Sequence, residues 1–473
     1  MSPIQQIMLG VSPGGEKYWI VADGSNTTSD NLDYRYIDVN SSGDVYVLGT
    51  VAKSDYSHRN YTGFHKYDKD GTNTYYKRYR WSGSANPSGS ACGMGTLTNG
   101  EFIVGNYSGS NTYVAGLGYV SASSGAMGWQ KNFCQPHSNT SGHALERMCV
   151  SNNNRIVGVE AGAGTGNKDI KFWEVGATGG LTNDWEISTR SSGSGSNYGC
   201  THRALTFDSS GNFYMAGRRG GTSTYNSWGW ICKFNTSMQL QWNRELGRNG
   251  SYELHAFNDI VVDSSGNVYL AGETRSGPTL GMVVKYNSSG VLQWQKELDH
   301  SSTSGSGNNL SLFGIDLDDD EDYIYVCGSQ DGWGTHPMWA KIAVDGTYQW
   351  SRYLRDMSGN HADRVRCIKV KGDNLYLGGN WYIGSSKYHG LVMKLPADGS
   401  CTGYYGPSNT FFYSDYVNPL NNLSLTDQGL LHNGSPWYVG APSATFQMST
   451  PPQTLGTDTV GWSEQKVAKD ICS

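Results

Sequence analysis

The chain has 473 residues, a formal net charge of −6, 63 glycines, 12% aromatic residues and only 16% charged residues. This composition is typical of an all-β, turn-rich protein and excludes the helical and disordered classes. With no basic run and no apolar stretch long enough to cross a bilayer, we expect neither nucleic acid binding nor membrane insertion.

The first predicted element is a strand around Trp19, in the run EKYWIVADG, which follows an N-terminal arm of residues 1–16. This run has the character of the fourth strand in the repeats that follow it along the chain. No first, second or third strand precedes it. It is therefore interpreted as one strand of a blade whose other strands come from elsewhere in the chain.

A pattern of about fifteen residues then recurs along the chain. Residues 258–272 read NDIVVDSSGNVYLAG, and residues 203–217 read RALTFDSSGNFYMAG. Five looser copies complete the series. The seven copies end at Gly49, Gly105, Gly158, Gly217, Gly272, Gly328 and Gly379. The first and last of these glycines are 330 residues apart over six steps, so the mean period is 55.

Each repeat contains four short runs rich in β-branched and aromatic residues, which predicts four strands. The turn DSSGN supplies an Asp that accepts backbone hydrogen bonds and a Gly that adopts positive φ. Four-stranded antiparallel units cannot bury both faces alone, and radial stacking lets each unit cover the next. The sequence therefore predicts an all-β, seven-bladed β-propeller over residues 17–403.

The last repeat has clear first, second and third strands but only a weak fourth. We expect the strand at Trp19 to fill this place and to pair with residues 391–394. Such pairing closes the ring and removes the exposed edges between the first and last blades.

The connections differ between the two ends of the predicted strands. Those joining strands 1 and 2, or 3 and 4, are short and alike, whereas those joining strands 2 and 3 are long and individual. Aromatic, Arg and His side chains in such loops are typical of binding surfaces, and we expect exposed rings at Trp228, Trp333 and Trp381. The alternative is that the rings pack the loops onto the scaffold. The candidate binding residues are Tyr61, Arg218, Arg219, Tyr225, Trp228, Trp333, His336, Trp381 and Tyr388.

One acidic turn raises the question of a metal. The run DLDDDEDY at 316–323 replaces the usual turn of the sixth repeat. Its candidate calcium ligands are Asp316, Asp318, Asp320 and Asp322. The central glycine of a calcium loop is missing, which favours a solvated acidic turn. With no G-x-S-x-G, H-E-x-x-H or P-loop pattern, we expect no catalytic residue, no metal and no cofactor.

The nine cysteines include no C-x-x-C pair. Four of them, Cys149, Cys232, Cys327 and Cys367, lie within strand patterns. They are interpreted as small buried apolar residues, and a disulfide framework is not needed in a core of this size.

The repeat is lost in the segment 404–473, which is polar and rich in Pro and Thr. This segment is too poor in apolar residues to form its own core. We expect it to run along the propeller or to dock on another subunit. Its end, SEQKVAKDICS, is the one helix-like stretch, with Ser463 as the candidate N-cap.

The unit DIVVDSSGNVYLAGET, followed by GMVVKYNSSGVLQWQKEL, resembles the bacterial and viral β-propeller repeat whose units read roughly D-x-x-G-N-x-Y-V-x-G, then V-x-K-x-x-x-x-G-x-x-x-W. The likeness covers about residues 17–404. It implies the propeller fold, and such propellers serve as adhesins, lectin-like modules and scaffolds. The opening MSPIQQIMLGVSPGG resembles the start of marine phage tail proteins, and it lacks the features of a secretory signal.

These resemblances imply a non-enzymatic structural and adhesive protein of a phage tail, located in the virion and homo-oligomeric. Its expected partners are other tail proteins, through residues 404–473, and a glycan on the host surface, through the long loops. The first alternative is a secreted or cell-surface bacterial adhesin. The second is a propeller lyase or hydrolase that acts on polysaccharide.

Overall fold

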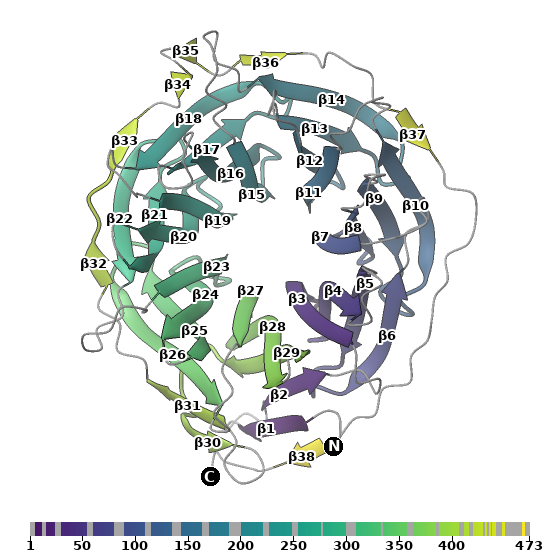
Figure 1. The fold of residues 1–473 in the computed structure, drawn as a ribbon, viewed down its shortest axis with the longest axis vertical. Coiled ribbons are helices and arrows are strands. Elements are labelled where there is room, and N and C mark those ends of the chain that lie inside the picture. The colour runs from purple at the N-terminus through teal and green to yellow at the C-terminus, as the bar shows by residue number, and fades with distance from the viewer. Residues whose placement is uncertain are drawn as a thin grey trace. The chain divides into compact units, whose positions relative to one another are not determined.

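The computed structural model has the predicted fold, a seven-bladed β-propeller with four-stranded antiparallel blades (Figure 1). Within the described residues, no helix is long and apolar enough to span a membrane. The residues that the structure describes are 5–11, 16–23, 30–53, 60–79, 89–108, 115–134, 143–162, 170–188, 200–220, 227–247, 254–275, 278–298, 309–332, 334–356, 363–384, 387–405, 411–415, 420–428, 431–432, 435–436, 438–440, 447–449 and 466–468.

The chain forms two compact units, and each is described by itself. Unit 1 comprises Met1–Arg80, Leu298–Asn421 and Gly456–Ser473, and unit 2 comprises Trp81–Glu297 and Asn422–Leu455. Blades are numbered here by the repeat that supplies their first strand. Unit 1 contains blades 6, 7 and 1, and unit 2 contains blades 2 to 5.

The strands of unit 1 follow the predicted repeats. Blade 1 consists of β3 (Asp30–Val39), β4 (Val45–Lys53), β5 (Asn60–Tyr67) and β6 (Asn73–Tyr79). Blade 6 consists of β23 (Asn309–Leu317), β24 (Tyr323–Gly332), β25 (Gly334–Ala343) and β26 (Tyr348–Asp356). Blade 7 consists of β27 (Arg364–Lys371), β28 (Asn374–Gly384), β29 (Lys387–Pro396) and β2 (Lys17–Asp23).

Unit 2 holds the other four blades. Blade 2 is β7 (Gly89–Thr96), β8 (Phe102–Ser108), β9 (Ala115–Val120) and β10 (Met127–Cys134). Blade 3 is β11 (His143–Val150), β12 (Ile156–Gly162), β13 (Ile170–Val175) and β14 (Leu181–Ser188). Blade 4 is β15 (Cys200–Phe207), β16 (Phe213–Gly220), β17 (Ser227–Phe234) and β18 (Leu240–Gly247). Blade 5 is β19 (Leu254–Val262), β20 (Val268–Arg275), β21 (Thr279–Tyr286) and β22 (Leu292–Leu298).

The N-terminal strand completes blade 7, as predicted. β2 pairs antiparallel with β29, and Trp19 lies opposite Lys394. The Trp19 side chain is fully buried in the core shared by blades 7 and 1, and its indole Nε1 donates to the Lys69 carbonyl at 3.1 Å. Removing this strand therefore exposes both an edge and a core.

The motif D-S-S-G-N-x-Y is one hydrogen-bonded unit. The Asp263 carboxylate accepts from the backbone N–H and the side-chain amide of Asn267, at 2.7 and 2.8 Å, and from the hydroxyl of Tyr269, at 3.2 Å. Gly266 adopts a φ of 79° and donates its N–H to the Asp263 carbonyl. Because each partner is within six residues, the repeated local sequence is enough to form this turn.

A β-bulge interrupts the first strand of each blade at the same place. The bulged residues are Arg35, Cys92, Glu146, Arg203, Asn258, Phe313 and Arg366. In six blades the glycine that ends the repeat motif pairs with a residue next to this bulge, and in blade 3 Gly158 pairs with Met148, two residues beyond the bulge. A Cβ on Gly272 would be 1.9 Å from the Ala256 carbonyl oxygen, so glycine is needed there because backbone occupies the place of a side chain.

Short strands of the C-terminal segment extend the blades at their outer edges (Figure 1). In unit 1, β31 (Phe411–Asp415) pairs with β26, β30 (Gly403–Tyr405) pairs with β31, and β38 (Lys466–Ala468) pairs with β1 (Gln5–Val11), which in turn pairs with β2. In unit 2, β33 (Thr426–Gln428), β36 (Tyr438–Gly440) and β37 (Gln447–Ser449) pair with β18, β14 and β10. The remaining strands are β32 (Leu420–Asn422), β34 (Leu431–His432) and β35 (Ser435–Pro436).

This segment is held by buried side chains as well as by strand pairing. In unit 1, Tyr413 is 1% exposed and its ring stacks on Trp339 at 5.7 Å. In unit 2, Leu423 and Leu425 are buried, and the Gln295 side chain exchanges two hydrogen bonds with the backbone of Leu425. The segment is expected either to run along the propeller or to dock on another subunit, and its described strands run along the propeller.

The predicted C-terminal helix is wrong at residues 466–468, which form a strand. They pair in parallel with β1, from Gln6 opposite Lys466 to Met8 opposite Ala468. A short stretch with few helix-stabilising contacts pairs more favourably with an open strand edge, which supplies backbone partners along its whole length.

Candidate functional site

Two of the candidate binding residues are buried. Trp381, in β28, is 5% exposed and belongs to the core of blades 6 and 7. Tyr61, in β5, is 6% exposed, and the guanidinium of Arg78 lies 4.6 Å from its ring centroid. The expectation of an exposed ring is therefore wrong for Trp381, because its strand continues further than the sequence indicated and carries the ring into the core.

Three more candidates are half-buried. Trp228 lies in β17, against the backbone of Gly247 on the neighbouring strand. His336 lies in β25, with its ring 6.4 Å from that of Tyr353. Tyr388 donates its backbone N–H to the Asn31 side chain at 2.9 Å. Tyr225, Trp333 and the side chain of Arg219 lie outside the described residues.

The acidic turn of blade 6 does not gather its carboxylates. Asp316 is buried, lies 3.0 Å from the Lys369 amine and accepts from the Val370 N–H at 2.8 Å. Burial raises the pKa of Asp316, while Lys369 opposes that rise. Asp318 accepts from the N–H groups of Asp322 and Tyr323, as a turn residue does. In the part of the chain that the structure describes, no three His, Cys, Asp or Glu side chains are placed to hold a metal ion.

The cysteines whose side chains the structure describes are of two kinds. The four that the sequence placed in strands are buried free thiols, which confirms their interpretation as small apolar residues. Cys401 differs, because it is disulfide-bonded. A disulfide persists in oxidising surroundings, so this bond adds a feature that the cysteine spacing did not indicate.

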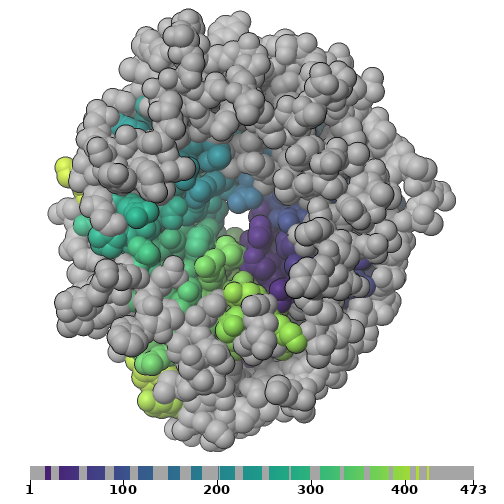
Figure 2. Space-filling view, viewed as in Figure 1, coloured from purple at the N-terminus to yellow at the C-terminus, as the bar shows by residue number. Residues whose placement is uncertain are grey.

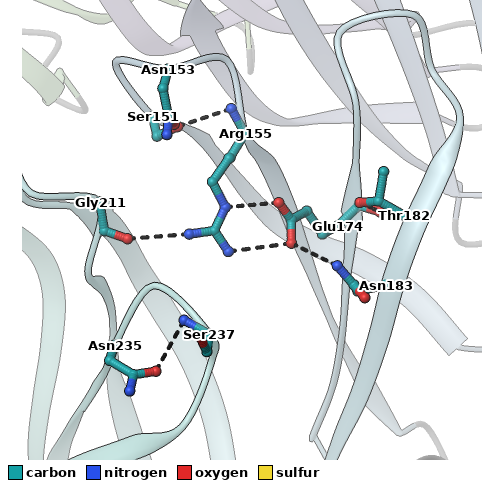
Figure 3. Close-up of polar contacts among 9 residues, drawn as sticks. All are labelled: Ser151, Asn153, Arg155, Glu174, Thr182, Asn183, Gly211, Asn235 and Ser237. Atoms are coloured by element: carbon teal, nitrogen blue, oxygen red, sulfur yellow. Dashed lines mark hydrogen bonds and ion pairs between the residues drawn. The ribbon is translucent and has the colours of Figure 1, made fainter.

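Arg155, which follows a tight turn, is saturated by its neighbours. We call the strand ends joined by the 1–2 and 3–4 turns the turn side, and the opposite ends the loop side. On the turn side of unit 2, Arg155 makes two bonds to the Glu174 carboxylate, at 2.7 and 3.2 Å, and donates to the Gly211 carbonyl of blade 4 (Figure 3). Asn183 donates to the same carboxylate. Each part of the Arg155 guanidinium thus has a protein partner.

Toward the loop side of unit 2, a polar group joins blades 4 and 5. We call Arg203, Arg218, Asn258 and Glu273 the Arg218 cluster. Arg203 and Asn258 occupy the bulges of β15 and β19, and Arg203 Nη1 donates to Asn258 Oδ1 at 2.6 Å. Glu273, in β20, lies 3.4 Å from the same nitrogen.

Arg218 is the open member of this cluster. Its side chain has no hydrogen-bond partner among the described residues, and the residue is half-buried in β16. Burial lowers the pKa of Arg218, the positive charge of Arg203 lowers it further, and Glu273 raises it. A guanidinium in this state retains donors for a ligand, and the carboxylate and amide beside it accept hydrogen bonds from hydroxyl groups.

The sequence predicted Arg218 but missed the other three members of the cluster. A signal was present, because Arg35 and Arg203 each precede the motif glycine of their repeat by 14 residues, and Arg366 precedes its glycine by 13. That recurrence marks the bulge. Partners on neighbouring blades are distant in sequence, so only the folded chain reveals that they meet.

No protein-family model and no curated protein matches this sequence. Solved structures with low sequence identity do match. The polysaccharide lyase Uly1 is 10% identical, with a TM-score of 0.47, over 80% of this chain and 91% of that one. The periplasmic gluconolactonase PpgL of Pseudomonas aeruginosa is 12% identical, with a TM-score of 0.38, over 90% and 100%. The quinohemoprotein alcohol dehydrogenase ADHIIG of Pseudomonas putida is 10% identical, with a TM-score of 0.41, over 80% and 78%.

Proposed function

We propose that this protein is a non-enzymatic structural and adhesive component of a virion, a phage tail protein that presents the loop side of its propeller to a glycan on the host surface. The observation that carries the proposal is the contrast between the two sides. Arg155 on the turn side is saturated by protein partners, whereas the Arg218 side chain, toward the loop side, has no hydrogen-bond partner among the described residues. The resemblance of the opening segment to marine phage tail proteins supports the location.

The chemistry of the Arg218 cluster suits a sugar. Glu273 and Asn258 present oxygen acceptors, and Arg218 presents a planar set of N–H donors. Each such contact is weak alone, so adhesion rests on several copies engaging one polymer at the same time. A structural role is supported by the C-terminal strands, which cover blade edges that are otherwise open to association with other chains.

A second candidate is the secreted or cell-surface adhesin. The disulfide at Cys401 favours it, because secreted proteins fold and remain in oxidising surroundings. Both candidates bind a glycan through the same residues. They differ in whether the propeller belongs to a phage particle or to a bacterial cell surface.

The test is binding without turnover. The full chain is run through gels that contain a panel of polysaccharides, and the same mixtures are assayed for new reducing ends and unsaturated products. We expect retention by at least one polysaccharide and no product. Arg218→Ala is expected to weaken retention about tenfold, the effect of one charge-assisted hydrogen bond.

Lys233→Ala is the matched control. Lys233 donates from an exposed position to the Ser288 carbonyl, in a 3–4 turn on the turn side. The variant removes the same charge from the other side and should bind like the wild type. Product formation, or equal losses in the two variants, contradicts the proposal.

A further inference from the structure

A second arginine group joins blades 7 and 1 in unit 1. We call Asp33, Arg35, Arg364 and Arg366 the Asp33 cluster. Arg366 occupies the bulge of β27 and donates through Nε to Asp33 Oδ1 at 2.8 Å. Arg35 occupies the bulge of β3 and donates through Nε to Asp33 Oδ2 at 3.1 Å. One carboxylate is thus shared by two guanidinium groups from different blades.

The cluster carries more positive charge than it neutralises. Arg35 and Arg366 pair with Asp33, and Arg364 lies near Arg366, so the four groups together carry a formal charge of +2. Arg364, two residues from Arg366, lies close enough to lower the pKa of Arg366, although burial is the larger cause of that lowering. Asp363, next to Arg364 in the sequence, is fully buried, accepts from the Tyr382 N–H and is not among the charges that shift the pKa of Arg366.

The guanidinium groups also keep unused donors. Within the described residues, Arg35 and Arg366 hydrogen-bond only through Nε, and Arg364 makes no side-chain hydrogen bond. A guanidinium has five N–H groups, so both terminal nitrogens of Arg35 and Arg366 remain available. Arg366 lies over the ring of Phe313, whose centroid is 5.3 Å from its central carbon, and this contact fixes the plane of the group.

Two other arginines between blades, unlike those of the Asp33 cluster and Arg218, use their terminal nitrogens within the protein. Arg244 donates to the carbonyls of Gly290 and Asn243, and Arg352 donates to those of Gly399 and Ser351. Those two arginines bind backbone carbonyls through two nitrogens each. The Asp33 cluster instead directs two arginines at one carboxylate through their Nε atoms, and their terminal nitrogens have no hydrogen-bond partner among the described residues.

The cluster is accessible. The side chains of Arg35, Arg366 and Asp33 are 38%, 24% and 18% exposed. The space-filling view shows described residues of β3, in purple, and of blade 7, in yellow-green, side by side on the visible face (Figure 2). An incoming anion can therefore reach the terminal nitrogens of these arginines.

We propose that the Asp33 cluster binds an oxyanion substituent of an acidic polysaccharide, either a uronate carboxylate or a sulfate ester. This inference rests on the proposed glycan-binding function and names the class of glycan. The planar fork of a guanidinium matches both substituents with two parallel hydrogen bonds. Asp33 orients the guanidinium groups of Arg35 and Arg366 through their Nε atoms. Because its carboxylate is also negative, it repels a bound anion and limits the affinity.

The ligand supplies the first arm of the test. Retention of the full chain is compared on polygalacturonate, on its methyl ester, on dextran sulfate and on dextran. We expect retention by polygalacturonate or dextran sulfate at least about tenfold stronger than by the matching neutral polymer, decreasing as salt rises. Which acidic polymer is retained distinguishes carboxylate from sulfate recognition.

The second arm of the test compares two variants of the protein that should change the affinity for acidic polysaccharide in opposite directions. Arg35→Gln removes a charge from the most exposed member and should weaken acidic binding about tenfold. Asp33→Asn removes the competing carboxylate and should strengthen acidic binding several-fold. A purely structural cluster predicts no gain from Asp33→Asn. Lys233→Gln, on the turn side, controls for net charge.

The outcomes separate the two proposals. Equal retention by acidic and neutral polymers overturns the oxyanion site and leaves glycan adhesion standing. No retention by any polymer overturns both. If the variants fail to fold, the comparison of polygalacturonate with its methyl ester still decides, because the polymers differ in charge and the protein is unchanged.

Discussion

Replacing Gly272 by alanine tests the packing that the repeat motif encodes. A Cβ at Gly272 would lie 1.9 Å from the Ala256 carbonyl oxygen and 3.0 Å from the Phe257 Cα. Both are backbone atoms of β19, so no side-chain rotation relieves the contact. Since Cβ contacts below 3.0 Å are essentially never seen, β19 must move away from β20 by about 1 Å.

That displacement acts on a closed core. Ala256 and Phe257 are fully buried, and Phe257 pairs directly with Gly272. Overpacking of such a core costs about 1–3 kcal/mol, and a weakened hydrogen bond between strands adds about 1 kcal/mol. We expect Gly272→Ala to lower the free energy of unfolding by about 3 kcal/mol.

Two other glycines provide controls for this measurement. Gly180 has no positive φ and no heavy atom within 4 Å of a built Cβ, so Gly180→Ala should change stability by less than about 0.5 kcal/mol. Gly100 has the same open space but a φ of 80°, so Gly100→Ala should cost about 1 kcal/mol through backbone strain alone. Urea unfolding followed by tryptophan fluorescence measures all three. If Gly272→Ala is no less stable than Gly100→Ala, the packing argument is wrong.

Three further predictions concern the outer strands, the acidic turn and the turn side. Ending the chain at residue 403 removes Tyr413 and its stack on Trp339, so we expect a lower urea midpoint of unfolding and aggregation in light scattering. Tyr413→Ala alone should lower the free energy of unfolding by about 3 kcal/mol. Calcium should not raise the thermal midpoint, because Asp316 is already held by Lys369; a rise that chelation reverses contradicts this reading. Arg155→Leu should lower the free energy of unfolding by about 3 kcal/mol, because it leaves the buried Glu174 carboxylate without its ion-pair partner. The double variant with Glu174→Leu should regain part of that stability, and urea midpoints of the single and double variants test both statements.

The phage-tail and adhesin proposals can be separated without a ligand. The proteins of purified phage particles, and the surface and secreted proteins of the bacterial host, can be examined by mass spectrometry. We expect the chain in the particles. Its presence only among the host's surface or secreted proteins would replace the first proposal by the second.

The sequence by itself determined the blades of this protein, because their signals are local. The bonds of Asp263 to Asn267 and Tyr269 span six residues or fewer, and the repeated turns identify each pair of strands. The place of Trp19 opposite Lys394 also followed from the sequence, since a counted repeat left one strand missing and one in excess. A sequence repeat can therefore predict a long-range strand pairing when only one blade lacks a strand and only one strand lacks a blade.

Only the tertiary structure decided which side chains meet between blades. Arg366 and Asp33 are 333 residues apart, and the bulges that bring them together arise from the pairing of strands rather than from a residue type. The sequence around Trp381 is typical of a loop. Pairing with β29 extends β28 past this residue, and the longer strand places the Trp381 ring in the core. The C-terminal strands have weak propensity of their own, and they form because blade edges offer unpaired backbone groups that a local pattern cannot reveal.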